Sequence, residues 1–316
     1  MAEHVWFITA CSSGFGRAIA FSALRRGHKV IATARDSSKL GELRDAGAVV
    51  MDVDVTSDDE TLTAKLAEAN AVFGKITHVV NCAGYILEGT IEEASNKEVF
   101  DQFNTNVFGT FNIARAATQY LRSAAAGEGG RRTALATFGS LGSWQSSAAV
   151  AHCMLCYASL INKHLTNLPL PLTDCSTKFA VSGLTEGLAD ELKAFGIDVC
   201  VVEPGYTRTG FLARGSGSGS DNHRIQTAKR LAVYDGTPAA ALRDAMEVYD
   251  GKQPGSVEKS AELIVDVLTG EGVAAGRPVP VRLVLGEDAV EAVRRKCKET
   301  LELLEAWEAV GRANTG

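Results

Sequence analysis

Near its amino terminus the chain reads Val5-Trp6-Phe7-Ile8-Thr9-Ala10-Cys11-Ser12-Ser13-Gly14-Phe15-Gly16, an apolar run followed by a turn of serines and glycines. A helical pattern over residues 17–26 comes next. A strand that turns through glycines into a helix points backbone N–H groups and the helix dipole at a bound pyrophosphate. The stretch predicts the first strand, turn and helix of a dinucleotide-binding fold, with Ser12, Ser13, Gly14, Phe15 and Gly16 at the cofactor. Taken alone, a glycine turn before a helix is a weak signal.

The same alternation of apolar runs and helical patterns continues along the chain. Strands are expected at residues 5–10, 29–34, 48–53, 76–81, 133–140, 198–202 and 279–285. Helices are expected at residues 17–26, 58–73, 96–124, 178–195 and 288–310. Short strands separated by helices of this length are typical of a parallel sheet with right-handed crossovers. We therefore expect one doubly wound α/β domain of three layers over residues 1–316, a Rossmann fold, with a substrate lid at about residues 205–255.

Composition limits the classes of function. Of the 316 residues, 46% are hydrophobic and 22% are charged, and the formal net charge is −6, which gives no general attraction to nucleic acid or to anionic membranes. Seven cysteines scattered through a chain of this length indicate reduced thiols. No secretory leader or membrane span is found in the sequence. We expect a cytoplasmic protein that binds a small molecule.

Further motifs lie in order along the chain, at the ends of the expected strands or within the expected helices. They are Asp54-Val55, Asn81-Cys82-Ala83-Gly84, Asn106-Val107-Phe108-Gly109, Ser140, Lys178 and Glu203-Pro204-Gly205-Tyr206-Thr207-Arg208-Thr209. With the glycine turn they resemble the short-chain dehydrogenase/reductase family over about residues 5–310. Cys11 to Gly16 and Gln253-Pro254-Gly255 are similar to its single-domain branch, and within it to a fungal and bacterial subgroup described as 17β-hydroxysteroid-dehydrogenase-like.

The resemblance implies a role for each matching residue. A Tyr would give a proton to a carbonyl oxygen while NADPH delivers hydride, and Lys178 would lower the pKa of that Tyr and hold the nicotinamide ribose. Ser140 would bind the substrate oxygen, and Asn106 would complete a proton path. The other implied cofactor residues are Asp54, Val55, Asn81, Ala83, Gly84, Pro204, Gly205, Thr207 and Thr209. The family also pairs the helices around Asn106 and after Lys178, so a homodimer or tetramer is expected.

Two positions bear on the cofactor. An acidic residue at the end of the second strand binds the ribose of NAD, whereas an Arg favours the 2′-phosphate of NADP. Here Ala34 is followed by Arg35, so we predict NADP(H); the alternative is a solvated Arg that opens a loop. The first turn glycine of the family is Ala10 in this chain, and we expect its Cβ to weaken cofactor binding without abolishing it.

The catalytic Tyr of the family precedes the Lys by four residues, and Asp174 occupies that position. A carboxylate beside Lys178 is ionised near neutral pH and has no proton to donate. The segment between Ser140 and Asp174 is also longer than in the family, and residues 153–173 form the extra piece. We expect this insert to displace the start of the helix that contains Lys178.

The genetic code suggests an origin for the insert. An intron could begin with the GT of a TGT codon for Cys153 and end in CAG, whose G is the first base of the Asp174 codon. Splicing would join the remaining T to the last two bases of the Asp174 codon and so leave a Tyr codon. We infer a retained intron; a genuine insertion is the alternative.

Other residues around the insert are candidates for chemistry. Cys153 and Cys156, with His152, His164 and Cys175, lack a second ligand pair of zinc-like spacing, so no metal site is predicted. Tyr157 is kept as a substitute proton donor. The sequence thus predicts an NADP(H)-dependent oxidoreductase that interconverts a carbonyl and a secondary alcohol. A cofactor-binding pseudoenzyme and a non-catalytic scaffold are the alternatives.

Overall fold

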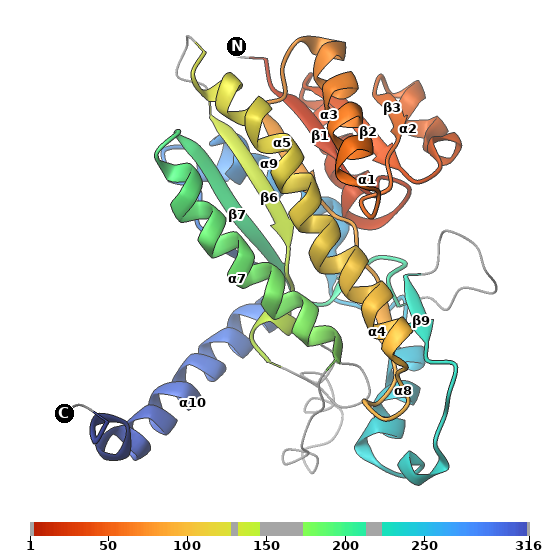
Figure 1. Ribbon diagram of the computed structural model, residues 1–316, viewed down its shortest axis with the longest axis vertical. Coiled ribbons are helices and arrows are strands. Elements are labelled where there is room, and N and C mark those ends of the chain that lie inside the picture. Colours follow the sequence, from red (N-terminus) through yellow and green to blue (C-terminus); the bar gives the residue numbers. More distant parts are fainter. Residues whose placement is uncertain (1–2, 128–131, 146–172, 213–222, 315–316) are drawn as a thin grey trace.

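A central parallel sheet organises the chain (Figure 1). The computed structural model describes residues 3–127, 132–145, 173–212 and 223–314. The sheet has seven strands in the order β11-β7-β6-β4-β1-β2-β3. Their bounds are β1 Val5–Ile8, β2 Lys29–Ala34, β3 Val49–Asp52, β4 His78–Asn81, β6 Thr133–Phe138, β7 Ile197–Pro204 and β11 Arg282–Leu285. The strand order reverses at β1, which pairs with both β2 and β4. Ligands of open α/β sheets bind outside the carboxyl ends of the strands at such a reversal.

Helices cover both faces of the sheet. They are α1 Gly14–Arg25, α2 Gly41–Asp45, α3 Asp59–Phe73, α4 Asn96–Phe103, α5 Gly109–Ala125, α7 Thr173–Lys193, α8 Pro238–Tyr249, α9 Val257–Thr269 and α10 Glu287–Arg312. Successive residues of a strand face opposite sides. In β1, Trp6 and Ile8 pack with α1 and α9, whereas Val5 and Phe7 pack with α3 and α5. The predicted doubly wound fold of three layers is confirmed.

One expected helix is interrupted. Residues 96–124 were predicted to form a single helix, but a π-helical segment at Asn104–Phe108 separates α4 from α5. The segment contains Asn106, which is buried. A π-bulge adds one residue to a turn, and such bulges are frequent at functional sites.

Short strands connect the lid segment to other parts of the chain. The strand β5 (Ile86–Glu88) pairs with β9 (Arg224–Gln226), and β8 (Thr207–Arg208) pairs with β10 (Gly255–Ser256). Arg224 Nε donates to a Glu88 carboxylate oxygen at 2.6 Å, and both side chains are 1% exposed. Arg243 of α8 forms an ion pair with Glu93. These buried pairs fix α8 and β9 to the segment that follows β4.

No helix in the described ranges combines the length and apolar content that a membrane crossing requires.

Candidate functional site

The glycine turn brings α1 against the carboxyl end of β1. A Cβ placed on Gly16 would lie 2.6 Å from the Ala10 carbonyl oxygen and 2.7 Å from that of Thr9. Atoms cannot approach so closely, so only glycine permits this packing. The first turn of α1 contains no acidic residue. Its N–H groups and dipole therefore suit an anion such as a pyrophosphate.

Ala10 has an unusual backbone conformation. Its φ is +55°, and within the described residues it is the only non-glycine residue with positive φ. The left-handed region costs an L-residue about 1–2 kcal/mol. The structure thus gives a physical basis for the expected effect of Ala10: this position of the turn suits glycine.

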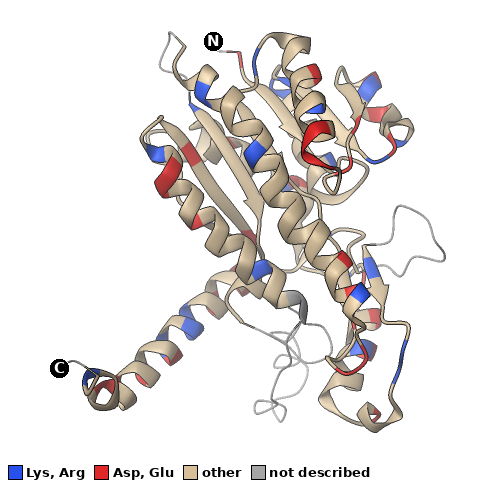
Figure 2. Cartoon of the chain, viewed as in Figure 1, with Lys and Arg blue, Asp and Glu red and all other residues tan. Residues whose placement is uncertain are grey.

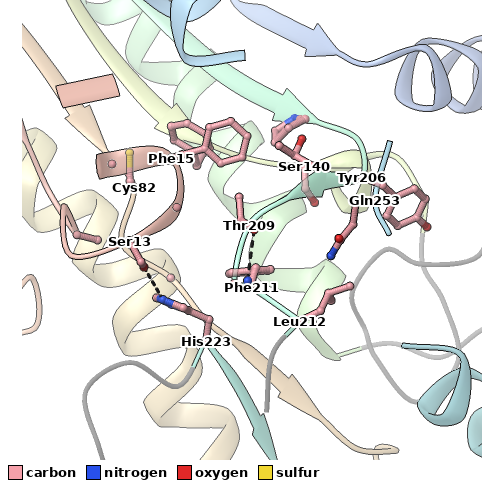
Figure 3. Close-up of a pocket in the computed structure, with 18 of the residues that line it drawn as sticks. Ser13, Phe15, Cys82, Ser140, Tyr206, Thr209, Phe211, Leu212, His223 and Gln253 are labelled. Carbon is pink, nitrogen blue, oxygen red and sulfur yellow. Dashed lines mark hydrogen bonds between the residues drawn. The ribbon is translucent and has the colours of Figure 1, made fainter. Parts of the chain in front are cut away.

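A pocket of about 150 Å³ lies at the carboxyl ends of the strands of the central sheet. Figure 3 shows side chains from the turn, the end of β6 and the loops after β7 facing the pocket. Its lining includes eleven residues that the sequence placed at the cofactor or the chemistry: Ser13, Gly14, Phe15, Gly16, Gly84, Ser140, Lys178, Pro204, Gly205, Thr207 and Thr209. The structure thus brings together the turn, the Pro-Gly loop and two of the three candidate catalytic residues, Ser140 and Lys178.

Lys178 is fixed inside this pocket. It is 7% exposed, and its Nζ donates to the carbonyl oxygen of Phe138 at 2.9 Å. The helix α7 that contains it begins at Thr173. The prediction that the insert displaces the start of this helix is therefore wrong, because Lys178 reaches the end of β6.

The turn-capping contact of Ser140 is compatible with its predicted role at the substrate. Its Oγ accepts from Gly142 N at 2.8 Å and so caps the short turn at Leu141–Ser143. A hydroxyl that accepts in this way still has its own proton to donate. Ser143, which the sequence did not single out, accepts from Ser140 N at 3.2 Å and donates to the Lys178 carbonyl at 3.0 Å. Ser143 therefore fixes Ser140 relative to Lys178.

Asn106 lies beside the pocket rather than in its lining. Its Oδ1 accepts from Tyr85 N at 3.0 Å, and its Nδ2 donates to Tyr85 O at 3.0 Å and to Thr177 Oγ1 at 3.2 Å. Thr177 immediately precedes Lys178, and a Cβ on Gly84 would contact both the Asn106 amide oxygen at 3.2 Å and Lys178 Nζ at 3.9 Å. Asn106 thus connects the segment after β4 to α7 next to the candidate catalytic cation.

Several predicted cofactor residues contact their own loops or the fold. Asn81 Oδ1 accepts from Thr9 Oγ1 at 2.5 Å and from Ala83 N at 3.3 Å, which joins the ends of β1 and β4. Asp54 accepts from Thr56 N at 2.9 Å and from its hydroxyl at 2.7 Å. The remaining ones that do not line the pocket are Ser12, Arg35, Val55 and Ala83.

A buried carboxylate stabilises the elements around Ser140. Glu203 of β7 is 0% exposed, and it accepts from Trp144 Nε1 at 2.8 Å, Ser182 Oγ at 2.9 Å and Arg282 Nη1 at 2.8 Å. Burial raises the pKa of Glu203, while Trp144 and Arg282 lower it. The sequence placed Glu203 in a motif but gave no signal for these partners, since they come from separate elements.

The start of α10 contacts the Pro-Gly loop. The Asp288 carboxylate accepts from Tyr206 N at 2.7 Å. A Cβ on Gly205 would overlap that carboxylate. Gly205 N in turn donates to Leu285 O at 2.7 Å. The loop that lines the pocket is therefore attached directly to the carboxyl-terminal helix.

The two candidate positions for the proton donor lie at or beyond the margin of the described residues. Asp174 lies in the first turn of α7, but its side chain is outside the described part. Tyr157 and residues 153–172 of the insert are also outside the described residues.

A second group of titratable side chains lies at the amino ends of the strands, on the side of the sheet away from the pocket. His4, His28 and Glu271 place potential ligand atoms within 4.8 Å of one another. Trp6 Nε1 donates to His28 Nδ1 at 3.1 Å, so neutral His28 keeps its proton on Nε2, and a metal at Nε2 would break that hydrogen bond. Desolvation first, and then the charge of His4, lower the pKa of His28 to about 4. The arrangement suits neutral packed rings better than a metal.

Known proteins share this architecture. A family model described as short chain dehydrogenase matches residues 4–131 and 173–216, more than half of the chain. Oxidoreductase calM of Penicillium decumbens is 31% identical over 314 residues, covering 96% of this chain and 90% of that protein. The 3-ketodihydrosphingosine reductase of Bacteroides thetaiotaomicron is 31% identical over 67% of this chain and 66% of its own length. A short-chain dehydrogenase structure from Streptomyces avermitilis superposes with a TM-score of 0.77 at 29% identity, covering both chains fully. The chain belongs to the short-chain dehydrogenase/reductase family of oxidoreductases.

Proposed function

We propose that this protein is an NADP(H)-dependent oxidoreductase that interconverts a carbonyl and a secondary alcohol in the pocket at the carboxyl ends of the strands. The observation that carries the proposal is the position of Lys178 and Ser140 in one pocket with the glycine turn and the Pro-Gly loop. One relative is named a reductase of a 3-keto compound, which supports a carbonyl substrate. The fungal relative supports assignment to the fungal and bacterial subgroup that the sequence resembles.

The side chains suit the proposed roles. A bound nicotinamide supplies or accepts hydride. The Ser140 oxygen accepts a hydrogen bond from Gly142 N, and its hydroxyl donates a hydrogen bond to the substrate oxygen. The buried ammonium of Lys178 stabilises negative charge at the proton donor and lowers its pKa. Asn106 holds the segment that precedes Lys178 through Thr177.

The end of β2 supports NADP over NAD. Arg35 follows the strand and is exposed, so its guanidinium can reach a 2′-phosphate. The next residue, Asp36, accepts from Ser38 N at 3.0 Å and from its hydroxyl at 2.6 Å. Both hydrogen bonds reach Oδ1 and hold the Asp36 carboxylate on its own loop, and Asp36 lies two residues beyond the end of β2, where a ribose-binding acid would be expected.

The full chain lacks the family's proton donor at position 174. Because Asp174 replaces the Tyr, the reaction requires either the spliced product, in which residues 153–173 are absent, or another donor such as Tyr157. A cofactor-binding pseudoenzyme is the second candidate function, and Asp174 is the observation that favours it. We further propose one cytoplasmic domain over residues 1–316 that acts as a homodimer or tetramer.

One assay tests the proposed function. NADPH oxidation is followed with a panel of ketones, aldehydes and quinones for the full chain and for a chain with residues 153–173 deleted and Asp174→Tyr. Turnover by the edited chain, lost on Lys178→Ala, is expected. NADPH binding without turnover in both chains would support the pseudoenzyme, and absence of any nicotinamide binding would refute both.

A further inference from the structure

Gln253 places a polar side chain in the pocket that the reaction described above does not use. The residue is 1% exposed and lines the pocket. Within the described residues neither its Nε2 nor its Oε1 has a hydrogen-bond partner. Figure 3 shows its amide among Tyr206, Phe211 and Leu212. A buried amide without hydrogen bonds destabilises a fold, so an unpaired amide in a pocket indicates a ligand that pairs with it.

The main chain around Gln253 is held in place. Arg208 donates to the Gln253 carbonyl oxygen from Nε at 3.3 Å and from Nη2 at 3.1 Å. Pro254 restricts Gln253 to extended conformations. Gly255 N donates to Tyr206 O at 2.9 Å, and a Cβ on Gly255 would lie 2.7 Å from that oxygen. The backbone therefore presents the amide to the pocket in one orientation.

We propose that Gln253 determines specificity by binding a second, neutral hydrogen-bonding group of the substrate, a hydroxyl apart from the reacting carbonyl. A carboxamide is uncharged and offers both donors and an acceptor, so it matches a hydroxyl, which also donates and accepts. Its neighbours Tyr206 and Leu212 belong to the buried apolar cluster of the lid. The substrate class is thus a hydroxylated carbonyl compound with an otherwise apolar body. This inference rests on the proposed function.

The nicotinamide carboxamide has similar hydrogen-bonding chemistry, so the experiment separates it from the substrate. The variant Gln253→Met keeps the length of the side chain and removes both polar groups. Three quantities are measured: the melting temperature of the ligand-free protein, the dissociation constant of NADPH, and the affinity of the NADPH complex for paired ketones. The pairs are 6-hydroxy-1-tetralone with 1-tetralone, and 4-hydroxycyclohexanone with cyclohexanone.

The proposal expects a specific pattern. Loss of an unpaired buried amide raises the melting temperature by about 2 °C. The affinity for NADPH changes by less than about twofold, while a preference of about tenfold for the hydroxylated ketone disappears. A lower melting temperature would show that the amide is satisfied within the fold. A loss of NADPH affinity would assign the amide to the cofactor, and equal wild-type affinity within both pairs would exclude a hydroxyl partner.

A lower melting temperature, a loss of NADPH affinity, or equal affinity within both ketone pairs would each overturn the proposal. None of the readouts needs turnover. A protein that prefers the hydroxylated ketones but reduces none of them would contradict the proposed function and support the role of Gln253.

An independent observation concerns α10, which projects away from the sheet and ends near the carboxyl terminus (Figure 1). Its buried residues, Ala289 and Ala292, lie in the first two turns. Farther along, five large apolar side chains are 59–64% exposed: Leu301, Leu303, Leu304, Trp307 and Val310. Their spacing places them on one broad face of the helix. A contiguous exposed apolar face of this kind marks an interaction surface.

Between residues 294 and 308 the charges of α10 form two blocks (Figure 2). The basic block comprises Arg294, Arg295, Lys296 and Lys298, and the acidic block comprises Glu299, Glu302, Glu305 and Glu308. At 100° per residue, the apolar face is centred near Trp307; Arg294 and Glu308 lie at its edge, next to Leu301, whereas Lys298 and Glu305 lie on the opposite side of the helix. The ion pairs within the helix, such as Lys298 with Glu302 at 3.7 Å, are exposed and contribute little.

We infer that α10 pairs antiparallel with α10 of a second copy, about a two-fold axis near Leu301. In this arrangement the basic block of each copy lies beside the acidic block of the other, and the two apolar faces cover each other. The self-complementary order of the two blocks favours a second copy over an unrelated partner.

Molar mass from light scattering tests the pairing. Leu304→Glu should halve the mass, whereas Ala309→Glu, on the opposite face, should not. Arg294→Glu should also halve it, and adding Glu308→Lys to the same chain should restore it. Circular dichroism checks that each variant keeps its helix content. A mass unaffected by Leu304→Glu, or a charge swap that fails to restore it, would overturn the inference.

Discussion

The ammonium of Lys178 lies 2.9 Å from the carbonyl oxygen of Phe138, at the end of the strand that leads to Ser140. This contact fixes the first turns of α7 against the sheet although the insert precedes them. Residues four apart share a face of a helix, so position 174 lies one turn before Lys178 on the same side. The helix therefore already offers a place for a proton donor.

Asp174→Tyr alone should raise activity in the full chain. Because α7 is docked, the new phenol would lie one turn from the Lys178 cation that lowers its pKa, and a positioned general acid contributes about 10²–10⁴-fold. Turnover of NADPH with ketones measures the gain. Asp174→Phe is the matched control, since it adds the ring without the hydroxyl. If only deletion of residues 153–173 with the same substitution restores turnover, the insert itself blocks the site.

Ala10→Gly should stabilise the protein and tighten cofactor binding. Relief of the positive φ is worth about 1–2 kcal/mol, of which the greater freedom of glycine in the unfolded chain removes about half, leaving roughly 0.5–1 kcal/mol. Urea unfolding and NADPH titration measure the two effects. Ala18→Gly in α1 serves as the control and should destabilise the protein by about 1 kcal/mol. Equal losses at both positions would show that Ala10 is not strained.

Arg35→Ala should weaken NADPH binding about tenfold and leave NADH binding unchanged, because only NADPH has the 2′-phosphate that the guanidinium would contact. Dissociation constants from fluorescence titration give the comparison. Arg44→Ala, another exposed arginine nearby in α2, should affect neither cofactor. Equal wild-type affinities for NADPH and NADH would disprove the assignment of NADP.

Stability should fall in acid partly because of His78. The residue is fully buried, and desolvation first, then the charge of His4, lower its pKa to about 3. Its pKa in the unfolded chain is about 6.5, so the unfolded state binds more protons as pH falls below that value. The contribution is complete above pH 6.5 and about 2 kcal/mol smaller at pH 5.

The measurement is the free energy of unfolding in urea at pH 7.5 and pH 5. His78→Gln keeps a donor for the Leu268 carbonyl, which His78 Nε2 contacts at 3.1 Å, but does not titrate. The variant should lose less stability between the two pH values. The same loss in both proteins would show that His78 does not contribute.

Pairing through the helices around Asn106 and after Lys178 remains a prediction. Phe108 and Phe111 near Asn106 are 48% and 45% exposed, and Phe179 in α7 is 46% exposed. Phe111→Asp should halve the molar mass by light scattering, since a buried carboxylate opposes an apolar interface. A chain lacking residues 153–173 tests whether the insert obstructs this contact. A monomer in both parent chains would exclude it.

The sequence predicted the sheet well because its strands are buried on both faces and form continuous apolar runs. The strand β2 begins and ends where expected, at Lys29 and Ala34. The π-helical segment at Asn104–Phe108 was missed because no proline or glycine breaks the pattern within it. The partners of Glu203 and the unpaired amide of Gln253 depend on contacts between distant segments, which composition and spacing do not specify.

The attachment of Asp288 to the Tyr206 amide has a consequence for regulation. A helix of 26 residues is about 39 Å long, so a contact at its free end acts on the pocket through this anchor and through Ala292, which packs in the same apolar cluster as Tyr206. If pairing of α10 shifts Asp288, the Pro-Gly loop shifts with it, and cofactor affinity then depends on protein concentration. Thermodynamic reciprocity requires NADPH to change the pairing equilibrium by the same factor. Sedimentation equilibrium with and without NADPH measures that factor, and an unchanged constant would mean that the anchor transmits nothing.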